Sequence, residues 1–161
     1  MIRRIKNLFS VKMPRTVEST GFEIVSAVML VVMWLVAAVA MRGSGKDAYA
    51  PMLMLAVGAT VAVGISLFSA YYPKMVMKNS NFLPKKATSM QCRCLCRMVR
   101  VLAVELVPTA TFGIMSEAGY RWADAASLVC ALFLIATNLY YSLKARSGSF
   151  SVADIIDLFR K

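Results

Sequence analysis

Four long apolar stretches constrain the fold of this 161-residue chain more than any other feature of its sequence. They cover about residues 22–41, 51–72, 98–115 and 123–143. A helix needs about 20 mainly apolar residues to cross the hydrocarbon core of a bilayer. The chain is 59% hydrophobic, above the roughly 45–50% that is usual in soluble domains. The sequence therefore predicts an all-α membrane protein, with four transmembrane helices in a single domain that spans residues 1–161.

The basic residues predict the orientation of these spans. Of the 19 Lys and Arg residues, 16 lie before the first span, between Lys74 and Arg100, or from Lys144 onward. Cytoplasmic segments are enriched in Lys and Arg, so we expect both termini, the loop 73–97 and the tail 144–161 to be cytoplasmic. This pattern is typical of a protein of the bacterial cytoplasmic (inner) membrane. The net charge of +11 then indicates contact with anionic inner-leaflet lipids rather than with nucleic acid.

Both ends of the chain carry amphipathic patterns. In MIRRIKNLFS the apolar residues share one helical face, as they do in SFSVADIIDLFRK at the other end. Such segments are typical of short helices that lie on a membrane surface. We expect an amphipathic helix at each terminus, with a disordered basic tail as the alternative for the first.

Local signals predict where the spanning helices begin and end. Ser19 or Thr20 is a candidate N-cap for the first helix, with Glu23 in its first turn, because hydroxyl side chains satisfy free backbone amides there. Pro73 would stop the second helix, and Gly119 would end the third. The two connections on the outer side should therefore be short.

Small and polar residues inside the spans predict contact between helices. Ala56, Thr60 and Gly64 recur every four residues in the second span, and Thr137 and Asn138 lie in the fourth. Small residues let helices approach closely, and polar side chains form hydrogen bonds between them. We expect packing within the chain, and a homo-oligomer or a membrane-protein partner beyond it.

Glu105 is the first candidate for a functional residue, since it lies inside an apolar span. Ionisable groups there are costly and often belong to an ion or proton path. Pro108 cannot donate to the carbonyl of Val104, so a free acceptor is expected nearby. The alternative is a shallow Glu105 that pairs with Arg97, Arg100 or a basic residue on another helix.

Cys92, Cys94 and Cys96 form the second candidate, a cytoplasmic thiol or soft-metal site. Thiolates suit soft metal ions, but this spacing is not the C-x-x-C of structural zinc sites. On a helix Cys92 and Cys96 would share a face, and Cys94 would point away. Ordinary cysteines near the membrane surface are the simpler interpretation, and no metal or other cofactor is expected.

Three segments resemble parts of the bacterial membrane proteins of unknown function that are related to the toxin-immunity and signalling proteins of the SdpI type. The segments are VVMWLVAAVA, SAYYPKMVM and RMVRVLAVELV, which fall between about Phe22 and Met115. The characteristic Pro-x-His motif of the outer loop is absent from RGSGKDAYAP. The resemblance implies a polytopic membrane protein with a regulatory or immunity-like role, and it assigns no functional residue.

The sequence as a whole favours a membrane protein that is not an enzyme. It contains no His, the commonest general base, and it has no paired carboxylates or phosphate-binding loop. We expect it to act through helix packing or a partner. A small oligomeric transporter or channel subunit that uses Glu105 is the alternative, and the thiol or soft-metal sensor is the second alternative.

Overall fold

The computed structural model describes residues 15–72 and 89–147, and all regular structure in these ranges is helical. The elements are α2 (Val17–Gly43), the short 3-10 turn η1 (Lys46–Ala48), α3 (Tyr49–Ser69), α5 (Ser89–Glu117) and α6 (Arg121–Ser147). Each of the four α-helices is long and apolar enough to cross a membrane. The predicted all-helical fold, with four helices long and apolar enough to span a membrane, is confirmed. The amphipathic helices expected at the two termini lie outside the described residues.

Helix α2 begins one turn earlier than the sequence pattern predicted. Its N-cap is Thr16, whose side chain accepts a hydrogen bond from the Ser19 amide at 3.2 Å. The Thr16 amide in turn donates to the Ser19 hydroxyl at 2.9 Å. This reciprocal capping box satisfies two backbone donors, which is why Thr16 starts the helix rather than Ser19 or Thr20. Glu18, and not Glu23, therefore lies in the first turn.

Helix α3 ends at Ser69, before Pro73 could stop it. The Tyr71 amide donates to the Phe68 carbonyl at 3.2 Å, and the Tyr72 amide donates to the Ser69 carbonyl at 2.9 Å. These tighter bonds turn the chain away from the helix axis. The turn places the Tyr71 side chain beside the other helices, as described below.

The connection between α5 and α6 is a short turn made at Gly119. Its φ is +93°, a left-handed conformation that glycine adopts without strain. The Gly119 amide donates to the Ser116 carbonyl at 2.8 Å, and the Tyr120 amide donates to the Met115 carbonyl at 3.1 Å. This pair of bonds is the Schellman motif, which closes a helix C-terminus. Gly119 ends the helix as predicted.

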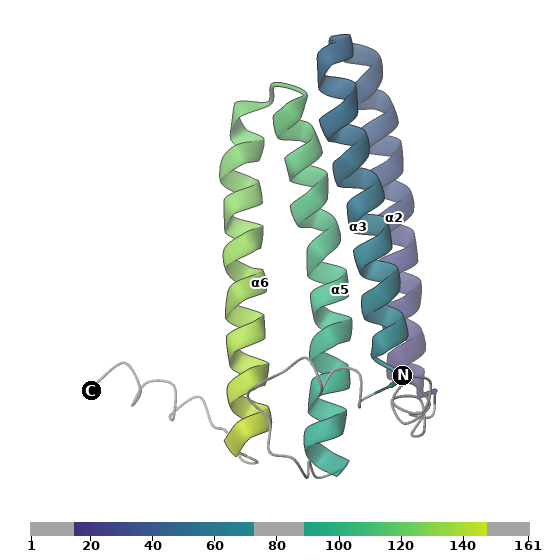
Figure 1. Cartoon of the computed structure of the whole chain (residues 1–161), viewed down its shortest axis with the longest axis vertical. Helices are drawn as coiled ribbons and strands as arrows, with labels where there is room; N and C mark the ends of the chain where they lie inside the picture. The colour runs from purple at the N-terminus through teal and green to yellow at the C-terminus, as the bar shows by residue number, and fades with distance from the viewer. Residues whose placement is uncertain (1–14, 73–88, 148–161) are drawn as a thin grey trace, which may run out of the picture.

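The four helices run alternately up and down (Figure 1). We call the end that holds the 44–48 and 118–120 connections the hairpin end, and the other the terminal end, because both ends of the described chain lie there. Helix α5 packs against α2, α3 and α6, whereas α6 makes its main contact with α5 alone. Helix α5 is therefore the centre of the fold.

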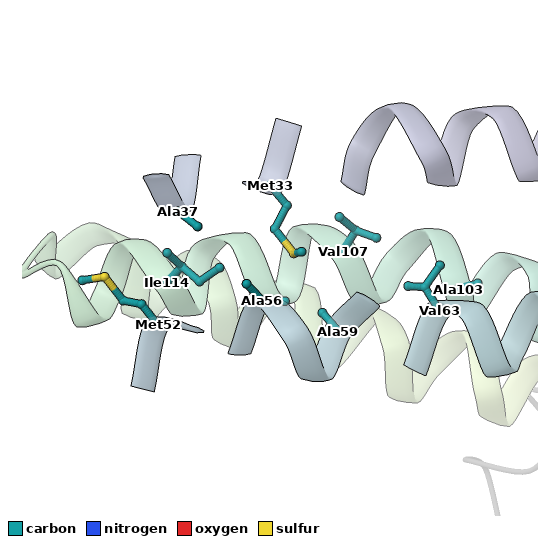
Figure 2. Packing of buried hydrophobic residues seen from close by; sticks show 10 residues of the cluster. Met33, Ala37, Met52, Ala56, Ala59, Val63, Ala103, Val107 and Ile114 are labelled. Carbon is teal, nitrogen blue, oxygen red and sulfur yellow. The ribbon is translucent and has the colours of Figure 1, made fainter. Parts of the chain in front are cut away.

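Helices α2, α3 and α5 share one apolar core (Figure 2). Its buried residues are Met33, Ala37, Met52, Ala56, Ala59, Val63, Ala103, Val107, Ala110 and Ile114. Half of them are alanines, and small side chains allow helix backbones to approach closely where lipid gives no hydrophobic driving force. We call this part of the molecule the three-helix core.

Helix α6 lies outside that core. Among residues 121–144 of α6 only Ala123 is buried, and the large side chains are mostly exposed. Among them are Leu128, Leu132, Phe133, Ile135 and Leu139. One side of α6 faces α5, and the rest is open to the surroundings of the bundle.

Candidate functional site

Glu105 lies between α5 and α6, and its two carboxylate oxygens have different surroundings. The Thr137 hydroxyl of α6 donates a hydrogen bond to Oε1 at 2.7 Å. Oε2 is buried and has no hydrogen-bond partner in the described part of the chain. Buried polar atoms normally have a partner. A proton or a cation could therefore occupy the free side of this carboxylate.

Threonine side chains form hydrogen bonds with the α5 backbone near Glu105, where a proline interrupts the regular pattern. Helix α5 continues through Pro108, which has no N–H to donate to Val104. One residue beyond it, the Thr109 hydroxyl donates to the Glu105 carbonyl at 2.9 Å. The Thr111 hydroxyl donates to the Val107 carbonyl at 2.8 Å. Threonine hydroxyls thus add hydrogen bonds to carbonyls around the proline.

The basic residues nearest in sequence to Glu105 do not pair with it. Arg97 forms an ion pair with Glu18 at 2.7 Å, and Arg100 lies over the ring of Tyr71 at 5.3 Å. The described residues form two ion pairs, and neither includes Glu105. Five residues along a helix correspond to a rotation of about 140°, so Arg100 faces α3 while Glu105 faces α6.

A second group of polar side chains lies at the terminal end, between α2, α3 and α5. We call it the terminal polar cluster, and it consists of Arg15, Glu18, Glu23, Tyr71, Arg97 and Arg100. Glu23 accepts a hydrogen bond from the Tyr71 hydroxyl and pairs with Arg15 at 3.2 Å. Tyr71 and Glu23 both raise the pKa of Arg15 above its usual value. The cluster links the ends of three helices.

The terminal polar cluster was not predicted from the sequence. The sequence places Glu23 in the first turn of the first helix and indicates no partner for it. Glu23 on α2 and Arg100 on α5 lie at the same end of the bundle. Their contact with Tyr71 can be predicted only when the two helices are known to be neighbours. That neighbourhood is a tertiary fact, since 77 positions separate Glu23 from Arg100.

Arg100 is the least exposed charged residue of the cluster, with 9% of its surface accessible. Its contact with Tyr71 is a cation–π interaction, worth about 0.5–2 kcal/mol depending on burial. An arginine remains charged in proteins and carries five N–H donors. A contact with an uncharged ring does not compensate this charge, and neither ion pair of the described residues includes Arg100.

The three clustered cysteines face different neighbours. Cys96 is 2% exposed and lies on the same face of α5 as the buried Ala103, seven residues further on. The Cys94 sulfur lies 4.0 Å from the Tyr141 carbonyl oxygen of α6. None of the four cysteines is in a disulfide. Among the described residues no group of three or more His, Cys, Asp or Glu side chains is arranged to hold a metal ion, so the geometry gives the soft-metal alternative no support.

Polar contacts occur along the whole junction of α5 with α6, which we call the α5–α6 seam. Near the hairpin end the Ser116 hydroxyl donates to Asp124. Near the terminal end the Ser142 hydroxyl lies 4.0 Å from the sulfur of Met98 and donates to Asn138 Oδ1 at 3.2 Å. The Glu105–Thr137 bond lies between them, so the sequence prediction that Thr137 bonds across helices is confirmed.

Asn138 is exposed on α6, next to the seam. Its Oδ1 accepts from Ser142 on its own helix, and its Nδ2 has no acceptor in the described ranges. The residue lies six positions before Lys144, or about 9 Å along the helix axis. An amide donor is therefore presented to the outside of the bundle within a helix that can span a membrane.

Comparisons of the chain with protein-family models, with curated proteins and with solved structures find no match.

Proposed function

We propose that this chain is an integral protein of a bacterial cytoplasmic membrane, with both termini in the cytoplasm. The proposal is supported by four helices that are long and apolar enough to span a bilayer. The segments that carry 16 of the 19 Lys and Arg residues adjoin the terminal end, and Arg42, Lys46 and Arg121 adjoin the hairpin end. The positive-inside rule then assigns the terminal end to the cytoplasm.

Within that membrane the protein acts without catalysis, by association of its helices with a second copy of the chain. The observation that carries this proposal is the exposed Asn138 of α6 with its unused amide donor. An asparagine amide both donates and accepts, so two copies of the same residue can bond to each other. Such bonds between membrane helices contribute about 0.6–2 kcal/mol. A regulatory or immunity-like role fits both this mode of action and the resemblance to SdpI-type proteins.

The test measures self-association in lipid vesicles by energy transfer between labelled copies of the full chain. Asn138→Leu should lower the apparent association constant at least about threefold, which corresponds to the lower figure for one such bond. Thr20→Val is the control, because it removes an exposed hydroxyl from α2 that bonds within its own helix. A strictly monomeric wild type, or equal effects of the two substitutions, would refute association through Asn138.

A second candidate function is a small oligomeric transporter or channel subunit with Glu105 on its ion path. The specific observation in its favour is the buried Oε2 without a partner, opposite the bond from Thr137. Glu105→Gln keeps the shape and removes the charge, and so it should abolish proton or cation flux through the reconstituted protein. Thr109→Val is the control, since Thr109 bonds only to the backbone carbonyl of Glu105. Unchanged flux in Glu105→Gln would exclude Glu105 from a transport mechanism.

A further inference from the structure

Arg100 is a charged group that neither proposed function uses. It lies on α5 with 9% of its surface exposed, and its guanidinium carbon is 5.3 Å from the centre of the Tyr71 ring. A cation removed from water is costly unless an anion compensates its charge. The surroundings of Arg100 should therefore contain an anion.

The acids of the terminal polar cluster are already engaged with other arginines. Glu18 pairs with Arg97 at 2.7 Å. Glu23 pairs with Arg15 and also accepts the hydrogen bond from Tyr71. These are the two ion pairs of the described residues. The Tyr71 ring attracts the guanidinium but carries no net charge.

The segments that directly flank Arg15, Tyr71 and Arg100 in the sequence contain no carboxylate. Residues 1–17 contain no Asp or Glu, and residues 70–104 contain none either. Three other acids, Asp47, Glu117 and Asp124, belong to the hairpin end. Glu105 faces α6, and the remaining two lie in the tail after α6. Among the described residues no carboxylate is therefore available to Arg100, and charge complementarity favours an anion from outside the chain.

The position of Arg100 along α5 indicates the chemistry of that anion. It lies 17 residues before Glu117, or about 26 Å along the helix axis. The hydrocarbon core is about 30 Å thick. With Glu117 near one surface, Arg100 lies close to the phosphates of the other. A guanidinium binds phosphate oxygens through two parallel N–H bonds.

We propose that Arg100, held over Tyr71 where α2, α3 and α5 meet, binds a phosphate group that an anionic phospholipid of the surrounding leaflet supplies. This site depends on the membrane-spanning fold and not on self-association through α6. Tyr71 fixes the guanidinium from one side. The Arg15 and Arg97 pairs keep both nearby glutamates from competing for it.

The test uses the full chain purified in a neutral detergent, with native mass spectrometry to count bound phosphatidylglycerol. The wild type should retain one tightly bound lipid, in preference to phosphatidylcholine. Arg100→Gln should weaken that binding at least about tenfold, because one charge-assisted contact of this kind is worth about 1.5–3 kcal/mol. Arg93→Gln is the matched control, since Arg93 is exposed on the same helix and its loss should leave binding within about twofold of the wild type.

Three further arms decide between the outcomes. Circular dichroism checks that the variants fold, and Arg100→Lys, which keeps the charge but not the two-point contact, should weaken binding by less than Arg100→Gln. Inorganic phosphate is titrated as a competitor, and complete displacement of the lipid at equal concentration would show free phosphate to be the ligand and overturn the lipid source. The proposal fails if the wild type retains phosphatidylcholine and phosphatidylglycerol equally, or if both glutamine variants bind phosphatidylglycerol like the wild type.

Discussion

The three-helix core and helix α6 are held in the molecule by different kinds of contact. Helices α2, α3 and α5 bury methionine, valine, isoleucine and alanine side chains against one another (Figure 2). Helix α6 meets only α5 over an extended area, where the Ser116 hydroxyl donates to Asp124 and the Thr137 hydroxyl donates to Glu105. Apolar packing is lost only when helices separate, whereas single hydrogen bonds can be exchanged for others. We therefore expect the core to be the stable unit and α6 to be the adaptable one.

Two ionisable side chains of α5, Arg100 and Glu105, also lie on opposite sides of this contrast. Arg100 faces the three-helix core, where helices meet from two sides. Glu105 faces the seam, where α6 provides a single hydroxyl and leaves one oxygen unpartnered. The cation is thus buried where three helices meet, at the place where we propose that a lipid phosphate binds. The carboxylate lies at a junction that could open.

The largest effect should follow from a cavity in the three-helix core. Met33→Ala removes a side chain with no exposed surface and should lower the free energy of unfolding by about 2–5 kcal/mol. Met54→Ala is the matched control, because Met54 is 76% exposed, and it should change the value by less than about 0.5 kcal/mol. Unfolding in mixed micelles provides the measurement. Equal losses in the two variants would contradict the assignment of the core.

Thiol labelling distinguishes the two sides of α5. In variants that keep a single cysteine, Cys96, which is 2% exposed, should react with a small permeant maleimide at least about tenfold more slowly than half-buried Cys94. Opening of the seam exposes Cys94, whereas Cys96 requires the core helices to separate. Denatured protein is the control, because both variants should then react alike. Faster reaction of native Cys96 would reverse the proposed order of stability.

Thr137→Val tests the seam itself. The substitution keeps the shape and leaves Glu105 Oε1 without its donor, so it should cost about 0.5–1.7 kcal/mol. A double-mutant cycle with Glu105→Leu, which removes the acceptor, should give a coupling energy of the same size, since the two side chains share the bond. Additive losses in the cycle would show that the bond contributes nothing to the attachment of α6.

The smallest effect should come from a polar bond between α2 and α3 at the edge of the core, where Trp34 is 36% exposed. The Trp34 indole N–H donates to the Thr60 hydroxyl at 3.1 Å, and that hydroxyl donates to its own helix. Trp34→Phe removes the donor but leaves Thr60 satisfied, so the loss should be about 0.5 kcal/mol. Trp122→Phe, at an exposed tryptophan, should have no measurable effect. A loss above about 2 kcal/mol would mean that this bond, rather than apolar packing, joins α2 to α3.

Much of the fold could be predicted because span length, charge bias and turn chemistry are local properties. The four spans follow from runs of apolar residues, and Gly119 follows from the left-handed turn that closes α5. Which helices pack against each other, and through which side chains, could not be predicted in the same way. A helix in lipid is apolar on every side, so its hydrophobic pattern does not identify the face that packs against a neighbour.

The sequence by itself therefore determined that the chain forms four helices long and apolar enough to span a membrane, and it singled out Glu105 and the 74–100 segment. Only the tertiary structure decided that Glu105 meets Thr137 and that Arg100 meets Tyr71. From the sequence, Arg100 is a possible partner for Glu105, because only five residues separate the two. The helix turns them to opposite neighbours, since the face of α5 that each occupies fixes which helix it contacts.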